Sequence, residues 1–235
     1  MSSKEQQLYV AVERNVVPLV LSLLKEPHLE PNWVSYATGR TPLHHACELG
    51  IPQIIEALLR HPLIMVNKPD KHGMTPLGFA VKERNLGAVI LLLEDPRVDP
   101  NIPDDRNRTP LFLAASLCSL EMVQWILVSK EVNSLKCHKK DEGSELSELS
   151  PADVALHRAK ATRGPTESDK DYESRTTDAR AISNLILAYR ASPQATRDTL
   201  LKSHPPRHPI DLYASLSLSL RSIRGPDVCS DCPLH

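Results

Sequence analysis

The most reactive side chains of the sequence gather near its C-terminal end, in the stretch Cys229-Ser230-Asp231-Cys232-Pro233-Leu234-His235. Two thiolates at this spacing can bind one Zn²⁺, and an imidazole follows closely. The remaining ligand is missing there, although Cys137-His138 could supply it from a distance. Two interpretations stay open, a partial zinc site or an exposed tail that oxidises easily. We favour the second and assign no metal ligand.

The sequence contains no motif typical of catalysis or of phosphate binding. The chain has ten histidines but only eight glycines, and it contains neither a glycine-rich phosphate loop nor a nucleophile elbow. For His44, a structural role is a better interpretation than acid–base work. We therefore expect no enzyme activity, no catalytic residue, no cofactor and no small-molecule substrate.

Charge and cysteine usage narrow the class of protein. Lys and Arg total 28 against 29 Asp and Glu, so no overall field attracts nucleic acid or an anionic membrane. The five cysteines are an odd number and widely spaced, which does not suggest a disulfide framework. No apolar stretch approaches the roughly 18 residues of a membrane span, and the charged N-terminus does not suggest a signal peptide. We expect a cytoplasmic or nuclear protein, not associated with membranes and monomeric.

Two sequence patterns recur in the same phase along the chain. A Thr-Pro-Leu pattern starts at Thr41, Thr75 and Thr109. A Leu-Leu pattern that runs on to Pro and Asn starts at Leu23, Leu58 and Leu92, and its asparagines are Asn32, Asn67 and Asn101. Two linked patterns at a spacing of about one helix pair indicate a repeat architecture.

The recurring residues predict pairs of helices. Thr caps the first free amides of a helix and Pro is tolerated at its first position, so the Thr-Pro steps predict the start of each first helix. The second helices carry apolar stripes that only a neighbouring unit can bury. These stripes are Ile54, Ile55, Leu58 and Leu59; Ala88, Val89, Leu92 and Leu93; and Met122, Val123, Ile126 and Leu127.

These patterns resemble the ankyrin repeat over residues 36 to about 135. The resemblance implies an all-α solenoid of helix-turn-helix units joined by short β-hairpins or turns, with about five repeats including degenerate end repeats. We place the units at 1–35 (degenerate), 36–69, 70–103, 104–138 and 139–190 (degenerate), followed by a C-terminal extension, 191–235. It also implies that Asn67 and Asn101 satisfy backbone groups of the loops and that a left-handed residue separates the helices, at Asn15, Gly50, Arg84 and Cys118.

The ends of the array depart from the pattern. In the first unit Gln6-Gln7 replaces Thr-Pro, and Ser150-Pro151 opens the last one. Residues 159–176 are a charged stretch that we expect to be a disordered insertion. Ser192-Pro193 predicts one further helix through about Lys202 that covers the open end of the stack. We expect most of the extension to be disordered.

A binding site is implied by the resemblance alone, because in ankyrin proteins the partner commonly lies in the concave groove between hairpin tips and first helices. The matching positions in this chain are Arg14, Arg40, Glu48, Leu49, Lys71, His72, Met74, Lys82, Glu83, Arg106 and Arg108. Their mild basic bias suggests an acidic segment of another protein as the partner, held by an adaptor, scaffold or inhibitor. The alternative is a regulatory subunit that binds nucleic acid or nucleotide through basic tips.

Overall fold

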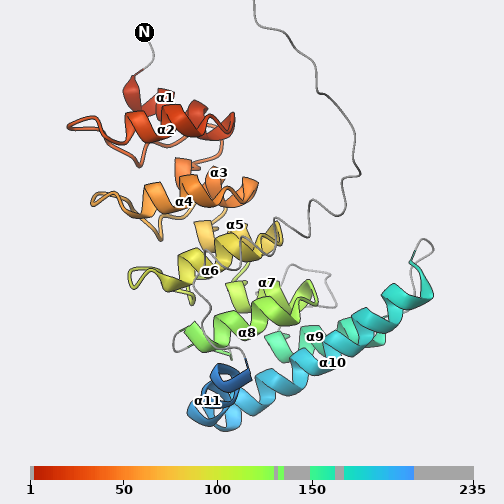
Figure 1. The fold of residues 1–235 in the computed structure, drawn as a ribbon. Helices are drawn as coiled ribbons and strands as arrows, with labels where there is room; N and C mark the ends of the chain where they lie inside the picture. Colours follow the sequence, from red (N-terminus) through yellow and green to blue (C-terminus); the bar gives the residue numbers. More distant parts are fainter. Residues whose placement is uncertain (1–2, 130–131, 135–148, 162–166, 204–235) are drawn as a thin grey trace, which may run out of the picture.

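The computed structural model describes residues 3–129, 132–134, 149–161 and 167–203, and its described part contains eleven helices and no strand. The helices fall into pairs that stack one on the next (Figure 1). The first helices are α1 (Lys4–Glu13), α3 (Pro42–Leu49), α5 (Pro76–Lys82), α7 (Pro110–Ser116) and α9 (Pro151–Lys160). The second helices are α2 (Val17–Leu23), α4 (Pro52–Leu59), α6 (Leu86–Glu94), α8 (Leu120–Ser129) and α10 (Asp169–Ala191), and α11 (Pro193–Ser203) follows. The predicted all-α solenoid is confirmed.

The first helices begin where the Thr-Pro steps predict. Thr41, Thr75 and Thr109 are the N-caps of α3, α5 and α7, each in an extended backbone conformation. Ser150 opens α9 in the same way and forms a capping box with Asp153. In the first unit the prediction was wrong, because α1 begins at Lys4, before Gln6, with Ser3 as its cap.

The stripes of the second helices form the core. First helices pack on first helices and second helices on second helices, so each unit buries its stripe against its neighbours. Ile54, Ile55 and Leu58 are fully buried, and Leu93 is 5% exposed. Leu59 is half-buried and packs at the margin of the core instead of inside it.

An asparagine ladder joins the loops that follow the second helices. Asn32, Asn67 and Asn101 occupy the same place in successive units, and each bonds to the backbone of the next loop. The bonds are Asn32 Nδ2 to Leu63 O (2.7 Å), Met65 N to Asn32 Oδ1 (2.7 Å), Asn67 Nδ2 to Arg97 O (2.7 Å), Asp99 N to Asn67 Oδ1 (2.9 Å) and Asn133 N to Asn101 Oδ1 (2.7 Å). The predicted structural role of these asparagines is confirmed, because their side chains pair with backbone groups of the neighbouring loops.

His44 ties two units together. Its Nδ1 accepts from Thr41 N (3.0 Å) and its Nε2 lies 3.1 Å from Met74 O in the next unit. Because a backbone N–H can only donate, Nδ1 carries no proton and Nε2–H donates to the carbonyl. The predicted structural role of His44 is confirmed, and Gly78 and Phe112 at the equivalent positions cannot reproduce it.

In the last unit, the prediction that residues 159–176 are a disordered insertion was wrong for much of that stretch. Helix α9 continues through Lys160 and α10 begins at Asp169, so much of the charged stretch 159–176 is helical, and Thr176 is buried. Arg175 stabilises this helix pair, since its guanidinium bonds to both carboxylate oxygens of Glu167 and to Arg158 O. Helices α9 and α10 lie side by side and project beyond the stack (Figure 1). Residues 162–166 lie outside the described part.

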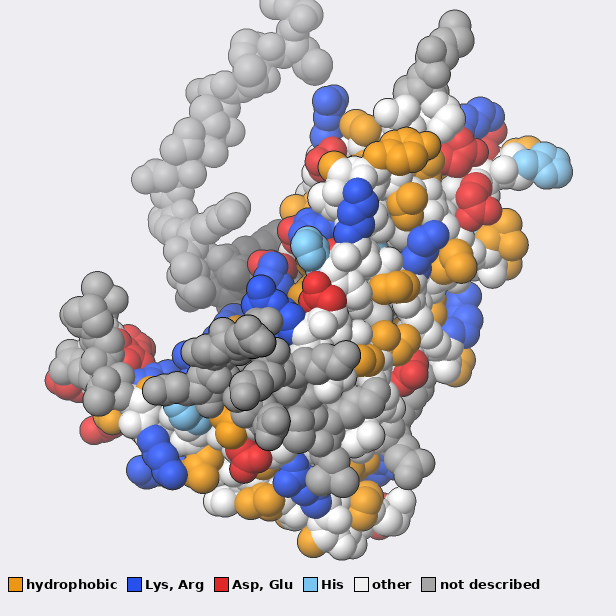
Figure 2. Space-filling model, turned by 180° about the vertical axis from the view of Figure 1, so that it is seen from behind, with side chains coloured by type: hydrophobic (Ala, Val, Ile, Leu, Met, Phe, Trp, Pro, Cys, Tyr) orange, Lys and Arg blue, Asp and Glu red, His pale blue; other side chains and the backbone are white. Residues whose placement is uncertain are grey.

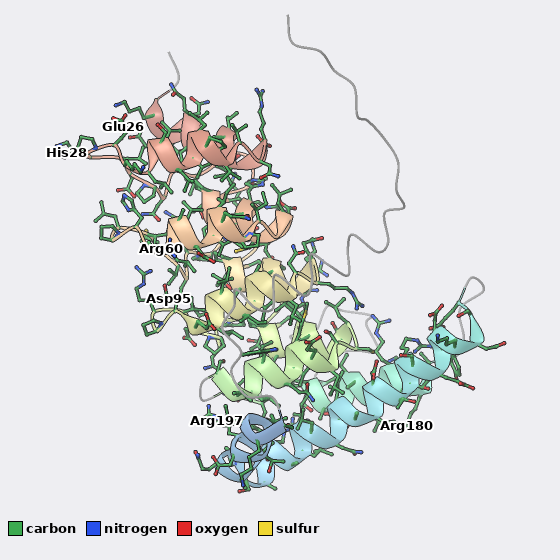
Figure 3. The ribbon with its side chains drawn as sticks, in the orientation of Figure 1. Glu26, His28, Arg60, Asp95, Arg180 and Arg197 are labelled. Atoms are coloured by element: carbon green, nitrogen blue, oxygen red, sulfur yellow. The ribbon has the colours of Figure 1, made fainter. Side chains whose placement is uncertain are left out.

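The helix predicted after Ser192 is confirmed as α11, within the extension we expected to be mostly disordered. It packs against α8 and α10. Arg197, which Figure 3 labels on this helix, donates through Nε to Leu127 O (3.1 Å) and lies over the Tyr189 ring. Residues 204–235 lie outside the described part, as do 135–148.

Leu59 and Leu93 are equivalent positions of successive units, but truncating them should lower the stability by different amounts. We expect Leu93→Ala to lower the free energy of unfolding by about 2–5 kcal/mol, since its side chain is buried. Leu59→Ala should cost clearly less, because part of that side chain already contacts water. Urea unfolding of the two variants checks this, and equal losses would contradict the assigned phase of the stripe.

A second prediction concerns the turn between α7 and α8. Arg84 and Cys118 have φ values of +58° and +54°, which confirms the predicted left-handed positions. Cys118→Gly should raise the free energy of unfolding by up to about 1 kcal/mol, because glycine adopts this backbone without strain. Arg84→Gly is the matched comparison and should gain less, since Arg84 Nη2 donates to Leu117 O (2.7 Å). A loss of stability on Cys118→Gly would refute the argument.

Stability should also fall in acid because of His44. Burial lowers the pKa of His44 from 6.5 to about 4, so between these values the unfolded chain binds a proton that the folded chain does not. This contribution is present above pH 6.5 and is lost as pH falls toward 4, by about 3 kcal/mol. His44→Phe, which copies the residue of a later unit, should be less stable at neutral pH but lose less stability on acidification. Parallel pH profiles from urea unfolding would contradict this.

Candidate functional site

An aromatic chain runs from the core to the surface between the first two units. Tyr9 on α1 is buried, and its ring lies edge-on to His45 and to Trp33, with ring centroids 4.9 Å apart in both contacts. Trp33 in turn contacts Tyr36 edge-on at 6.4 Å. The side chain of Tyr36 ends the chain and is 87% exposed. We call Tyr36, Trp33, Tyr9 and His45 the aromatic chain.

A charged cluster continues from the aromatic chain along α3 and α5. Tyr9 OH and His45 Nε2 lie 2.6 Å apart, and His45 Nδ1 lies 3.2 Å from Glu48. Glu48 also receives Arg40 Nη1 on both carboxylate oxygens, at 3.0 and 3.1 Å. The guanidinium of Arg40 lies over the Phe79 ring at 4.3 Å, a cation–π contact. Arg40 and Glu48 therefore compensate each other's charge.

Burial shifts the protonation of the groups between the aromatic chain and this cluster. It lowers the pKa of His45 and raises the pKa of Tyr9, because the charged form of each group would lose hydration. At neutral pH, Tyr9 OH can donate to a neutral His45 Nε2 while His45 Nδ1–H donates to Glu48. The cluster is thus a hydrogen-bonded network that links the aromatic chain to Arg40 and Glu48 and holds these side chains in place.

Backbone bonds fix the loops that carry these residues. We call residues 36–40, 70–74 and 104–108 the tip loops. Lys71 N donates to Thr38 O (3.1 Å) and Asp105 N donates to His72 O (2.9 Å), so each tip loop is bonded to the next. Lys71 Nζ also donates to Tyr36 O. We call the face formed by the tip loops and the exposed residues of the first helices, together with the aromatic chain, the tip surface.

Four of the residues expected to contact a partner gather in this part of the tip surface. Arg40 and Lys82 lie over the Phe79 ring, with Lys82 Nζ 5.6 Å from its centroid, and Glu48 holds Arg40. Lys71 bonds to the backbone of Tyr36. The other expected contact residues with exposed side chains are Arg14, Leu49, His72, Glu83 and Arg106. Of these, Leu49 is 47% exposed and is the apolar member.

The structure corrects one of the expected contact residues, Met74, and shows that the charge of another, Arg108, is compensated. Met74 is only 7% exposed, because its loop folds its side chain into the core beside Gly78, so it cannot face a partner. Arg108 is held by Asp104 through an ion pair of 2.6 Å, and that carboxylate is itself buried. The sequence suggested a row of positive charges along the tips. Two of its members, Arg40 and Arg108, are compensated by Glu48 and Asp104.

Figure 2, which shows the molecule from behind, also shows charges of both signs side by side. In Figure 2, Lys and Arg side chains lie among Asp and Glu side chains along the middle of the face and do not form one uninterrupted basic field.

Sequence reasoning missed the aromatic members of this site. Tyr9, Trp33 with Tyr36, and Phe79 come from three separate segments, and the stacking of units places these segments side by side. A signal was present, since the chain has only two Trp, five Tyr and two Phe. Aromatics are concentrated where proteins bind one another, so their clustering is informative.

Metal binding finds no support among the residues that the structure describes, where no group of three His, Cys, Asp or Glu could hold an ion. The stretch Cys229–His235 and the pair Cys137-His138 lie outside them. Burial raises the pKa of Cys47 and of Cys118, which disfavours thiolate ligands. In the same part of the chain, no helix is both long and apolar enough to cross a membrane.

Comparison with known proteins identifies the repeats. The family profile described as "Ankyrin repeats (3 copies)" matches residues 8–104 and 67–141, which together span more than half of the chain. Alpha-latrotoxin-Lg1a of Latrodectus geometricus and alpha-latrotoxin-Lh1a of Latrodectus hasselti are each 37% identical to it over 73 residues. That stretch is 30% of this chain and only 5% of either toxin.

Ankyrin repeats are generally protein–protein interaction modules and typically have no enzymatic activity. The matched residues begin within α1 and run through α8, the helices whose pairs stack through the stripes and the asparagine ladder. The chain belongs to the ankyrin-repeat family.

Proposed function

We propose that the protein is an interaction module that binds another protein on the tip surface, with Tyr36 at the centre of the contact. The observation that supports this is the 87% exposure of Tyr36 at the end of an otherwise packed aromatic chain. Tyr and Trp dominate the binding energy of many interfaces, because they bury a large area at a small cost in conformational entropy. A partner that covers Tyr36 would complete the packing that Trp33 and Tyr9 begin.

The surface is also preorganised for binding. The tip loops are bonded to one another, Lys71 fixes the backbone of Tyr36, and Glu48 holds Arg40 in place. A surface that is already ordered loses little conformational entropy when it binds. The ion pairs of Arg40 and Arg108 weaken the nucleic-acid alternative, because phosphate binding relies on basic side chains with uncompensated charge. We propose an adaptor, scaffold or inhibitor role for the module.

Site-specific photocrosslinking tests this proposal. A benzophenone amino acid replaces Tyr36 in one variant and Leu63 in a matched control, since Leu63 is 55% exposed in a ladder loop outside the tip surface. We expect irradiation in cells to yield a discrete protein adduct from position 36 and not from position 63. Adducts from position 63 alone, or none from position 36 in a folded and expressed variant, would contradict the proposed site.

A further inference from the structure

We infer that the partner presents a segment in which an aromatic or large aliphatic side chain is flanked by carboxylates. This inference rests on the proposed function and adds the chemistry of the partner. It combines two properties of the tip surface at Tyr36, an uncovered aromatic side chain and a lysine, Lys71, that bonds to a backbone carbonyl and not to a carboxylate.

The apolar area needs an apolar group from the partner. Tyr36 is the most exposed large apolar side chain of the described residues, and Trp33 beneath it is half-buried. An apolar side chain that packs against Tyr36 would remove this area from water at about 25 cal/mol for each Å². A purely charged segment would leave the aromatic ring uncovered.

The charges around Tyr36 favour carboxylates over cations. Lys71 Nζ bonds to a backbone carbonyl, which carries no formal charge, so its positive charge is not compensated there. Lys82 pairs with Glu83 at 3.2 Å, but both side chains are more than a third exposed and such a pair contributes little. A carboxylate of the partner can therefore take the place of Glu83.

Glu48, the acid of the charged cluster, does not attract a cationic group of a partner instead. Glu48 already receives Arg40 on both oxygens and His45 on one, so it offers a cationic partner no open carboxylate. Arg40 Nε is buried and has no hydrogen-bond partner among the described residues. Glu13 also acts on Tyr9 and His45, and Arg40 and Lys82 are paired with Glu48 and Glu83. The preference for carboxylates therefore rests on Lys71, whose ammonium bonds to the backbone of Tyr36.

Selection from a library of short random peptides displayed on phage tests the inference, with the full chain as bait. We expect enriched peptides to combine an aromatic or large aliphatic residue with neighbouring Asp or Glu. A labelled peptide from the enriched pool is then titrated by fluorescence polarisation at low and at physiological salt. Tyr36→Ala should weaken binding about tenfold or more.

Matched variants separate the two properties of the surface. Lys71→Ala with Lys82→Ala should weaken binding several-fold and flatten its salt dependence, because exposed charges act through screened attraction. Lys25→Ala with Lys170→Ala removes the same charge at exposed positions outside the tip surface and should change neither. Leu63→Ala controls for the loss of an exposed apolar side chain.

The outcomes distinguish this inference from the proposed function. Enriched peptides that are basic or proline-rich, yet depend on Tyr36, would overturn the acidic and apolar chemistry and leave the tip surface as the site. Binding that is indifferent to Tyr36 but lost in Leu63→Ala would overturn the site itself. Failure to enrich any peptide above the unselected library, with a folded bait, would also count against both.

Discussion

Each helix pair buries its apolar stripe only against the next pair, and the whole structure depends on this contact. Ile54, Ile55 and Leu58 would be exposed in an isolated unit, yet they are fully buried in the array. Stability is therefore shared among neighbours, as in other repeat proteins. The same contact fixes the spacing of the tip loops, so the geometry of the surface follows directly from the core. The backbone bonds between tip loops then fix the loops at that spacing.

Local rules explain why much of this fold was predictable. Thr-Pro steps at helix starts, the period of the stripes and the left-handed turn positions each follow from a few adjacent residues. The helical part of 159–176 was missed because its composition is charged and its stability comes from contacts that sequence does not reveal. Arg175 on α10 bonds to Glu167 and to Arg158 O on the facing helix α9, and Thr176 is buried in the same helix pair.

The site was less predictable than the fold, because its members meet only through stacking. Tyr9 and His45 lie 36 positions apart in the sequence, and their contact depends on α1 packing against α3. Its place in the repeat predicted that Met74 lies on the surface, but its side chain packs into the core. The same reasoning treated Arg40 and Arg108 as uncompensated charges, whereas Glu48 and Asp104 form ion pairs with them. Charge at a repeat position is thus a poor guide until its neighbours are known.

The asparagine ladder gives the array a direction. Among the described residues, each asparagine of the ladder bonds forward, to the loop of the following unit. When a unit separates at the C-terminal side, the group left behind is an amide side chain, which can rotate into water. When a unit separates at the N-terminal side, the groups left behind are a carbonyl and an N–H of a fixed loop, which cannot rotate freely. The two ends of an ankyrin array held in this way are therefore not equivalent in how they fray, even where their helices are alike.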